Sequence, residues 1–248
     1  MISTQFVSQL RLRTEDVPSF DTYPFSLPAV RNLDVLKFHP KVTFLVGENG
    51  SGKSTLLEAI AVSFGFNPEG GTKNFTFSTR ASHSDLHKFL RLGKGFRRPA
   101  DGFFLRAESF FNLGTEIEAL DREPSFDPPI IDAYGGRSLH EQSHGESFMA
   151  LLLKRFRGNG FYVLDEPEAA LSPQRQLAVL ARIHALANAG SQFIIATHSP
   201  LLMMYPDAFL YSCTESGLQL SSAQETAHYQ VMRDFFQDPH RMMRATLA

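Results

Sequence analysis

The feature that most constrains the fold is a glycine-rich octapeptide at residues 47–54. It reads Gly-Glu-Asn-Gly-Ser-Gly-Lys-Ser and follows a continuous apolar run, Val42–Val46. An apolar run without polar alternation is typical of a strand that is buried on both faces. Residues Ser54–Phe64 show a helical pattern and end before Gly65, which predicts a helix with a glycine C-cap. The sequence therefore predicts a strand, a tight glycine loop and a helix, in that order.

The octapeptide fits the phosphate-loop pattern G-x-x-x-x-G-K-S/T. Its glycines let backbone N–H groups curl around phosphate oxygens, and the following helix N-terminus adds the positive end of its dipole. We expect Lys53 to contact the outer phosphates of a nucleotide and the Ser54 hydroxyl to ligate Mg²⁺. The predicted nucleotide-binding residues of this loop are Gly47, Asn49, Gly50, Ser51, Gly52, Lys53, Ser54 and Thr55.

Two further strands are predicted to end in polar side chains. The apolar run Phe161–Leu164 is followed by Asp165 and Glu166, which is the Walker B pattern. Carboxylates at the carboxyl end of a core strand face the crevice where ligands bind in open α/β sheets. We expect Asp165 to hold Mg²⁺ and Glu166 to polarise the attacking water. His198 directly follows the apolar run Gln192–Thr197, where it would sense a γ-phosphate; Glu166 and His198 are the predicted catalytic residues.

The segment Ser143-His144-Gly145-Glu146 has two compatible interpretations. S-x-x-E before an apolar run is a capping box, which predicts a helix over Glu146–Arg157. A hydroxyl and free N–H groups at a helix N-terminus also bind anions. If this surface met the nucleotide of another subunit, it would hold the γ-phosphate.

Composition indicates an ordinary folded protein of 248 residues. Hydrophobic residues make up 43%, which excludes disorder of the whole chain. The chain has 24 Lys and Arg against 26 Asp and Glu, and this near-neutral balance argues against a general nucleic-acid coat. The single Cys213 cannot form an internal disulfide, and the first residues contain no apolar signal region. No apolar run approaches the roughly 18 residues of a membrane helix. We therefore expect a cytoplasmic protein without membrane insertion.

The alternation of apolar strands and helices predicts an α/β fold with a mostly parallel core sheet, helices on both faces and an N-terminal antiparallel β portion. We expect one domain over residues 1–248, with a basic insertion at 66–111 and a short acidic segment at 112–142. The other predicted strands are Phe6–Leu12, Phe25–Val30, Val35–Phe38, Gly102–Ala107, Phe209–Cys213 and Leu218–Leu220. The other predicted helices are Pro173–Ala189, with Ser172 as N-cap, and Thr226–Phe236.

The order of GENGSGKST, SHGES, YVLDEP and THS resembles the ABC-type ATPases over most of residues 40–205. This resemblance implies ATP and Mg²⁺ as ligands, and a homodimer that holds two ATP molecules head to tail. Ser143, Gly145 and Glu146 of one protomer would then complete the site of the other. The sequence departs from the family at His144, where a glycine is usual. Glu108 would take the metal-binding place of the Q-loop glutamine.

The resemblance also implies an aromatic ring against the adenine, for which Tyr23, Phe25 and Phe38 are the candidates. The segment from Glu108 to Ser143 is short and rich in Pro and acidic residues. In this respect the chain resembles an AAA family ATPase of the SMC-like and RecF-like branch that has neither a coiled coil nor a Toprim domain. That branch implies DNA or a separately encoded repair or defence protein as the partner. The alternative is the nucleotide-binding subunit of an ABC transporter.

Two weaker patterns remain. Lys88–Arg98 contains five basic residues and no acid, which fits either a phosphate-backbone contact or a solvated loop. His140-Glu141-Gln142-Ser143-His144 matches the zinc-protease pattern H-E-x-x-H, which requires both histidines on one helix. The capping box places His140 outside the helix, so we treat the protease only as a rival hypothesis.

Overall fold

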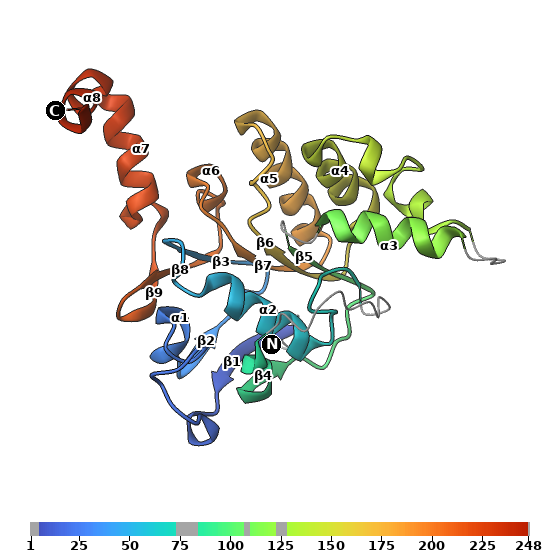
Figure 1. Cartoon of the computed structure of the whole chain (residues 1–248), viewed down its shortest axis with the longest axis horizontal. Helices are drawn as coiled ribbons and strands as arrows, with labels where there is room; N and C mark the ends of the chain where they lie inside the picture. The colour runs from blue at the N-terminus through green and yellow to red at the C-terminus, as the bar shows by residue number, and fades with distance from the viewer. Residues whose placement is uncertain (1–4, 73–83, 107–109, 123–127, 248) are drawn as a thin grey trace.

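The computed structural model describes residues 5–72, 84–106, 110–122 and 128–247. Its centre is a six-stranded sheet in the order β5-β6-β7-β3-β8-β9 (Figure 1). The first five of these strands pair in parallel, and only β9 pairs antiparallel, with β8. The strands are β3 (Val42–Gly47), β5 (Asp101–Arg106), β6 (Gly160–Asp165), β7 (Gln192–Ala196), β8 (Phe209–Thr214) and β9 (Gly217–Ser221). The predicted α/β fold with a mostly parallel core is confirmed.

Two apolar cores lie on the two faces of this sheet. Along β3, Val42, Phe44 and Val46 pack into one core, whereas Leu45 packs into the other. Successive side chains of a strand point to opposite faces, so a strand covered on both sides must be apolar throughout. One face carries α5 (Pro173–Asn188) and α6 (Pro200–Met203), and the other carries α1 (Pro28–Arg31) and α2 (Lys53–Phe64).

A small antiparallel sheet packs beside α2, and two of its three strands are N-terminal strands that the sequence predicts. Its order is β2-β1-β4, with β1 at Val7–Leu12, β2 at Val35–Lys37 and β4 at Leu90–Lys94. The Gln192 side chain joins it to the main sheet, because its Oε1 accepts hydrogen bonds from the N–H groups of Phe6 and Val7 at 3.0 Å each.

The predicted strand over Phe25–Val30 is wrong, because the chain forms helix α1 there. Pro28 stands at the first helical position, where its fixed φ suits a helix and its missing N–H costs nothing. The preceding Leu27 is extended and begins the turn. Phe25 is buried in the core around α2 rather than in a strand.

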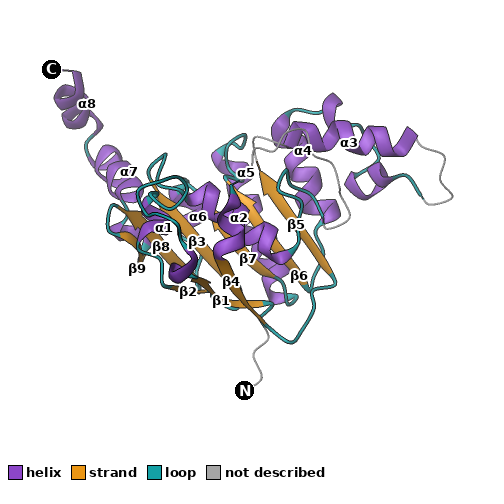
Figure 2. Cartoon of the chain, turned by 60° about the horizontal axis from the view of Figure 1, so that its bottom comes forward, coloured by secondary structure: helices purple, strands orange, loops and turns teal. Residues whose placement is uncertain are grey.

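A helical lobe follows β5 at one edge of the sheet (Figure 2). This α3–α4 lobe, residues 110–155, contains α3 (Phe110–Arg122) and α4 (His144–Ala150), and it ends in a π-helical turn, Leu151–Arg155. Its described residues also form 3₁₀ turns at Ile130–Tyr134 and Leu139–Glu141. The predicted helix over Glu146–Arg157 is thus confirmed in place, although it changes to π-helical hydrogen bonding halfway.

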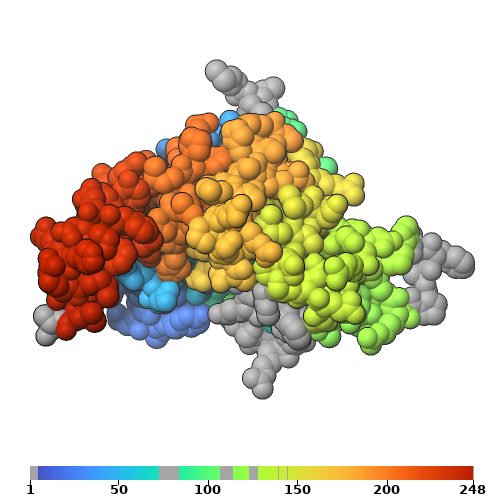
Figure 3. Space-filling model, turned by 90° about the horizontal axis from the view of Figure 1, so that it is seen from above, coloured from blue at the N-terminus to red at the C-terminus, as the bar shows by residue number. Residues whose placement is uncertain are grey.

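The C-terminal arm leaves the opposite side of the molecule. It comprises α7 (Ala227–Gln237) and α8 (Pro239–Leu247), and its red ribbon extends away from the sheet in Figure 1. The space-filling view shows the arm at one end of the molecule and the α3–α4 lobe at the other (Figure 3). Further 3₁₀ turns lie at Thr14–Asp16, Asp85–Phe89 and Ala223–Glu225. Within the described ranges, no helix has the length and apolar character needed to cross a bilayer.

Candidate nucleotide site

The glycine loop joins β3 to α2, as predicted, and its conformation depends on glycine. Gly50 and Gly52 have φ values of +79° and +94°, which side chains other than glycine rarely adopt. A Cβ added to Gly52 would also lie 2.9 Å from the Cβ of Leu27. The loop is therefore a tight cradle closed by α1, and α2 begins directly at Lys53.

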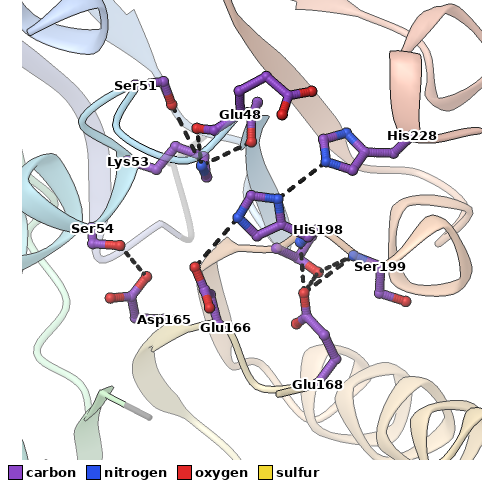
Figure 4. A network of polar contacts seen from close by, with 12 residues as sticks. Glu48, Ser51, Lys53, Ser54, Asp165, Glu166, Glu168, His198, Ser199 and His228 are labelled. Atoms are coloured by element: carbon purple, nitrogen blue, oxygen red, sulfur yellow. Dashed lines mark hydrogen bonds and ion pairs between the residues drawn. The ribbon is translucent and has the colours of Figure 1, made fainter. Parts of the chain in front are cut away.

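Lys53 folds back over this cradle (Figure 4). Its Nζ donates hydrogen bonds to the carbonyls of Gly47 and Glu48, at 2.8 and 2.9 Å, and to Oγ of Ser51 at 3.4 Å. Burial lowers the pKa of Lys53, although nearby acidic groups, Glu166 first, oppose the shift. A buried ammonium group held by two carbonyls and a hydroxyl is positioned to meet an anion at the mouth of the loop.

Ser54 and Asp165 come from different elements and meet at the same point. The hydroxyl of Ser54, in the first turn of α2, donates to Oδ1 of Asp165 at the end of β6, at 3.0 Å. Hydroxyl and carboxylate oxygens are the ligands that Mg²⁺ prefers, so these two residues fit the predicted cation. Of the other predicted residues, Asn49 is exposed at the loop tip, and Thr55 is half-buried in α2. Glu108 lies outside the described residues.

Glu166 and His198 face each other across the ends of neighbouring strands. Oε1 of Glu166 lies 3.3 Å from Nε2 of His198 (Figure 4). Glu166 has a φ of +50°, an uncommon value for a non-glycine residue, and its N–H donates to the carbonyl of Ala196 at 3.0 Å. That turn points the Glu166 carboxylate toward the Lys53 end of the site, where the pKa of Lys53 responds to it.

Glu168 is a residue that the sequence analysis missed. Its Oε1 accepts hydrogen bonds from the Thr197 hydroxyl at 2.7 Å and from the N–H groups of His198 and Ser199, at 2.6 and 3.1 Å. One carboxylate oxygen thus fixes the whole loop that carries His198. The only sequence signal was a third acid shortly after the Walker B pair, which has no distinctive spacing.

His228 is the second missed residue. Its Nε2 lies 3.1 Å from Nδ1 of His198, on the side of that ring opposite Glu166 (Figure 4). Burial, and then the charge of His198, lower the pKa of His228. A cavity of about 550 Å³ is lined both by residues 47–51 of the loop and by residues 225–228. The C-terminal arm therefore begins inside the candidate nucleotide site.

The capping box at Ser143 is confirmed. Its Oγ accepts from the N–H of Glu146 at 3.3 Å, and Oε2 of Glu146 accepts from the Ser143 N–H at 3.0 Å. Hydrogen bonds from Ser143 lower the pKa of Glu146. Gly145 is buried, and a Cβ there would lie 2.7 Å from the carbonyl oxygen of Ala170. Ser143 and Glu146 are exposed, and no hydrogen bond between described residues joins them to residues 47–54 of their own chain.

The rival H-E-x-x-H interpretation is wrong. His140 lies in the 3₁₀ turn Leu139–Glu141, and His144 begins α4. Gln142 between them is extended, with φ −112° and ψ 153°, so the two histidines do not share a helix. Among the described residues, no group of three or more His, Cys, Asp or Glu is arranged to hold a metal ion.

The exposure of the rings separates the three candidates for adenine stacking. Phe25 and Phe38 are 4% and 2% exposed and belong to the apolar core around α2. A buried core ring has no free face for a base, so these two candidates are excluded. Tyr23 is 64% exposed and is the one remaining member of the predicted set.

Two family models match this chain. The first, described as "AAA domain", matches residues 16–98 and includes the glycine loop. The second, described as "AAA domain, putative AbiEii toxin, Type IV TA system", matches residues 130–204 and includes Ser143, Asp165, Glu166 and His198. The two matches together contain the predicted site residues except Glu108.

Similar proteins include transporter ATP-binding proteins. The chain is 29% identical over 156 residues to the "Probable branched-chain amino acid transport ATP-binding protein LivF" of Archaeoglobus fulgidus, which covers 59% of this chain and 65% of that protein. It is 29% identical over 206 residues to a "Putative ABC transporter ATP-binding protein" of Methanothermobacter marburgensis, covering 75% of this chain and 70% of the relative. It spans only 12% of a Schizosaccharomyces pombe "Brefeldin A resistance protein", at 26% identity over 183 residues.

A solved structure of "an ATP-binding cassette of an ABC transporter" shares the fold. It superposes with a TM-score of 0.50 at 17% identity, over 84% of this chain and 90% of that one. Both family matches, the relatives and the arrangement of Lys53, Ser54 and Asp165 agree. The chain is a P-loop, ATP-binding protein of the ABC-ATPase type.

Proposed function

We propose that this protein hydrolyses ATP and that ATP binding closes a head-to-tail homodimer. The observation that carries the proposal is the convergence of three pairs of polar groups at the carboxyl edge of the sheet: Lys53 with the loop carbonyls, Ser54 with Asp165, and Glu166 with His198. These pairs match the three tasks of phosphoryl transfer, which are holding phosphates, organising the cation and orienting water.

In this proposal, Lys53 and the N–H groups of residues 50–54 hold the β- and γ-phosphates. Lys53 would exchange its contacts with the loop carbonyls for phosphate oxygens. Bound Mg²⁺ would supply charge neutralisation between the phosphates. Ser54 and Asp165 would hold that cation, because their oxygens already lie 3.0 Å apart. Glu166 would accept a hydrogen bond from the attacking water, and His198 would contact the γ-phosphate.

The position of Ser143 supports the proposed dimer. Its hydroxyl is exposed at the start of α4, and no hydrogen bond between described residues joins it to the loop at residues 47–54 of the same chain. A second copy turned by two-fold symmetry would bring this end of α4 to the γ-phosphate. Gly145 would then serve indirectly, since its close packing on Ala170 fixes the start of α4. We propose that the whole chain acts as one such domain in the cytoplasm.

Lys53→Ala tests the ATPase proposal directly. We expect loss of ATP hydrolysis and at least about tenfold weaker ATP binding, because a buried phosphate contact would be removed. Lys41→Ala, an exposed lysine at the amino end of β3, is the matched control and should hydrolyse ATP normally. Equal hydrolysis by Lys53→Ala and the control would refute the proposal.

The comparisons favour a transporter subunit, and not DNA, as the partner on which this ATPase acts. Two of the three similar proteins named above are transporter ATP-binding proteins, so the transporter alternative has better support than the SMC-like and RecF-like prediction. We therefore propose a separately encoded membrane protein as the first partner to test. Co-purification of the Glu166→Gln variant from a detergent extract of its native cells should recover an integral membrane subunit. Recovery of soluble proteins alone would contradict this assignment.

One observation keeps a DNA-linked function as a second candidate. Lys94, Arg97, Arg98 and Arg155 line a cavity of about 710 Å³, next to Phe96, which is 69% exposed. Asp101 neutralises Arg155 at 2.7 Å, but the other three cations leave a positive rim beside an exposed ring. Phosphates and stacked bases are bound by such combinations. The cavity lies at the start of β5, so DNA there would act at the edge opposite the nucleotide site.

A gel shift with Glu166→Gln, with and without Mg-ATP at about 150 mM salt, tests this candidate. Single-stranded and duplex oligonucleotides should both be used, because base stacking favours single strands. A shift that disappears on reversing Arg97 and Arg98 to Glu would support DNA binding. No shift at concentrations where the dimer forms would remove DNA from consideration.

A further inference from the structure

The C-terminal arm is an amphipathic extension whose side chains are not buried by the described residues of the chain. The structure describes every residue of α7 and α8, and none of them is buried. Met232 and Phe236 lie one turn apart on α7 and are 43% and 69% exposed. Met243 and Leu247 repeat the same spacing on α8, at 45% and 75% exposed. Side chains four residues apart share a helix face, so each helix presents an apolar stripe to solvent.

The arm starts at the nucleotide site. Thr226 caps α7, and His228, in its first turn, contacts His198 and lines the same cavity as the glycine loop. From this point α7 and α8 extend away from the body of the protein (Figure 1). The base of the arm therefore forms part of the wall of the cavity beside the glycine loop.

The order of the sheet places the arm and the α3–α4 lobe on opposite sides of that loop. The lobe follows β5, one edge of the sheet, and the arm follows β9, the other edge, with β3 between them. In a two-fold, head-to-tail pair, each loop faces the α4 N-terminus of the other copy. The same rotation brings the arm of each copy alongside the lobe of the other. This step rests on the dimer proposed above.

The charges of the two surfaces are complementary. Helix α8 carries Arg241 and Arg244 and no acid, whereas the one arginine of α7, Arg233, is paired with Asp234 at 2.7 Å. The described residues of the lobe before α4 are mainly acidic: Glu116, Glu118, Asp121, Asp132 and Glu141 against Arg122 and Arg137. Attraction of this kind fixes the register of an interface and disfavours other partners.

We propose that the C-terminal arm is a clasp that grips the α3–α4 lobe of a second copy of this chain when the ATP dimer closes. Its apolar stripe, Met232, Phe236, Met243 and Leu247, packs against the partner copy. Arg241 and Arg244 lie toward the acidic segment of the partner's lobe. His228 ties the base of the clasp to His198, so the clasp is anchored at the same site that binds the nucleotide.

Dimer affinity in the Glu166→Gln background tests the clasp. Phe236→Glu and Met232→Glu should each weaken the Mg-ATP dimer at least about tenfold in sedimentation velocity, because a charge would enter an apolar contact. Leu220→Glu is the matched control, since Leu220 is 64% exposed on β9, outside the arm. ATP binding to each protomer, measured with a fluorescent analogue below the dimer concentration, should not change.

Charge reversal gives a second, independent test of the clasp. Arg241→Glu with Arg244→Glu should weaken the dimer, and adding Asp132→Lys with Glu141→Lys to the same chain should restore it. Both lobe residues are exposed, so these substitutions leave the fold intact. A structural defect in the arm would not be repaired by changes in a distant lobe.

The outcomes separate the clasp from the dimer itself. If Glu166→Gln with an intact arm stays monomeric while ATP is bound, the proposed dimer fails. If it dimerises and the arm variants dimerise equally well, the clasp alone is wrong. Flotation with vesicles of phosphatidylcholine and phosphatidylglycerol completes the test. Vesicle binding that needs Phe236, with dimer affinity unchanged, would overturn the clasp and assign the stripe to a membrane surface.

Discussion

Oε1 of Glu166 and Nε2 of His198 lie 3.3 Å apart, although the two residues follow different strands, β6 and β7. The pairing arises because β6 and β7 are parallel neighbours whose carboxyl ends meet at one edge. Glu168 then fixes the His198 loop through three hydrogen bonds. Two strand ends and one anchoring carboxylate therefore set the geometry of the proposed water-activating pair.

Glu168→Ala should destabilise the fold and slow hydrolysis. The variant leaves the Thr197 hydroxyl and two N–H groups without their acceptor, which costs about 3 kcal/mol in the free energy of unfolding. Glu168→Gln keeps a carbonyl oxygen in the same place and should lose only about 1 kcal/mol. Urea unfolding measures both. Equal stability of the Ala variant and the unmodified protein would show that the hydrogen bonds to this loop do not matter.

Acidification should weaken the contact between His198 and His228. Burial lowers the pKa of His228 below its ordinary value of 6.5, so the unfolded chain takes up its proton first as the pH falls. The stabilisation is complete above about pH 6.5 and is lost progressively below it. Urea unfolding from pH 7.5 to 5.5 should show this loss.

His228→Gln should flatten that pH dependence, whereas His240→Gln, on exposed α8, should leave it unchanged. Some dependence will remain, because burial also lowers the pKa of His39. An identical pH profile for His228→Gln and the unmodified protein would contradict the assignment. The His228→Gln variant should also hydrolyse ATP more slowly, since His198 would lose its second contact.

Gly145→Ala should destabilise the start of α4 by about 1–3 kcal/mol, because the new methyl group would meet a backbone carbonyl. The added Cβ would lie 2.7 Å from the Ala170 oxygen and 2.7 Å from Nη1 of Arg175. Removing the flexible neighbour, in Arg175→Ala with Gly145→Ala, should not restore stability. Full rescue by Arg175→Ala would show that the arginine, and not the backbone of Ala170, requires glycine at this position.

Much of the core and of the candidate site was predictable because the signals were local. The loop at residues 47–54 and helix α2 with its Gly65 cap follow from glycine chemistry and apolar spacing. Ser172 caps α5 as predicted, and the capping box at Ser143 forms as predicted. Asp165 and Glu166 could be placed because a continuous apolar run marks a buried strand.

The missed features depend on contacts between distant segments. Glu168 and His228 act through His198, and no pattern near them in the sequence marks that contact. Helix α3 went unpredicted because proline and acidic residues nearby suggested a loop, and α8 went unpredicted although Pro239 stands at its first position. The expected strand at Phe25–Val30 failed because Pro28 starts a helix as readily as it ends a strand.

Light scattering of the Glu166→Gln variant tests the central claim most directly. With Mg-ATP the account predicts a mass of twice 27.8 kDa, and with Mg-ADP or without nucleotide it predicts a single chain. Ser143→Arg in the same background should stay monomeric, because its side chain would block the partner's phosphate site. A monomer in Mg-ATP, with nucleotide binding confirmed in the same sample, would contradict the ATP-gated dimer.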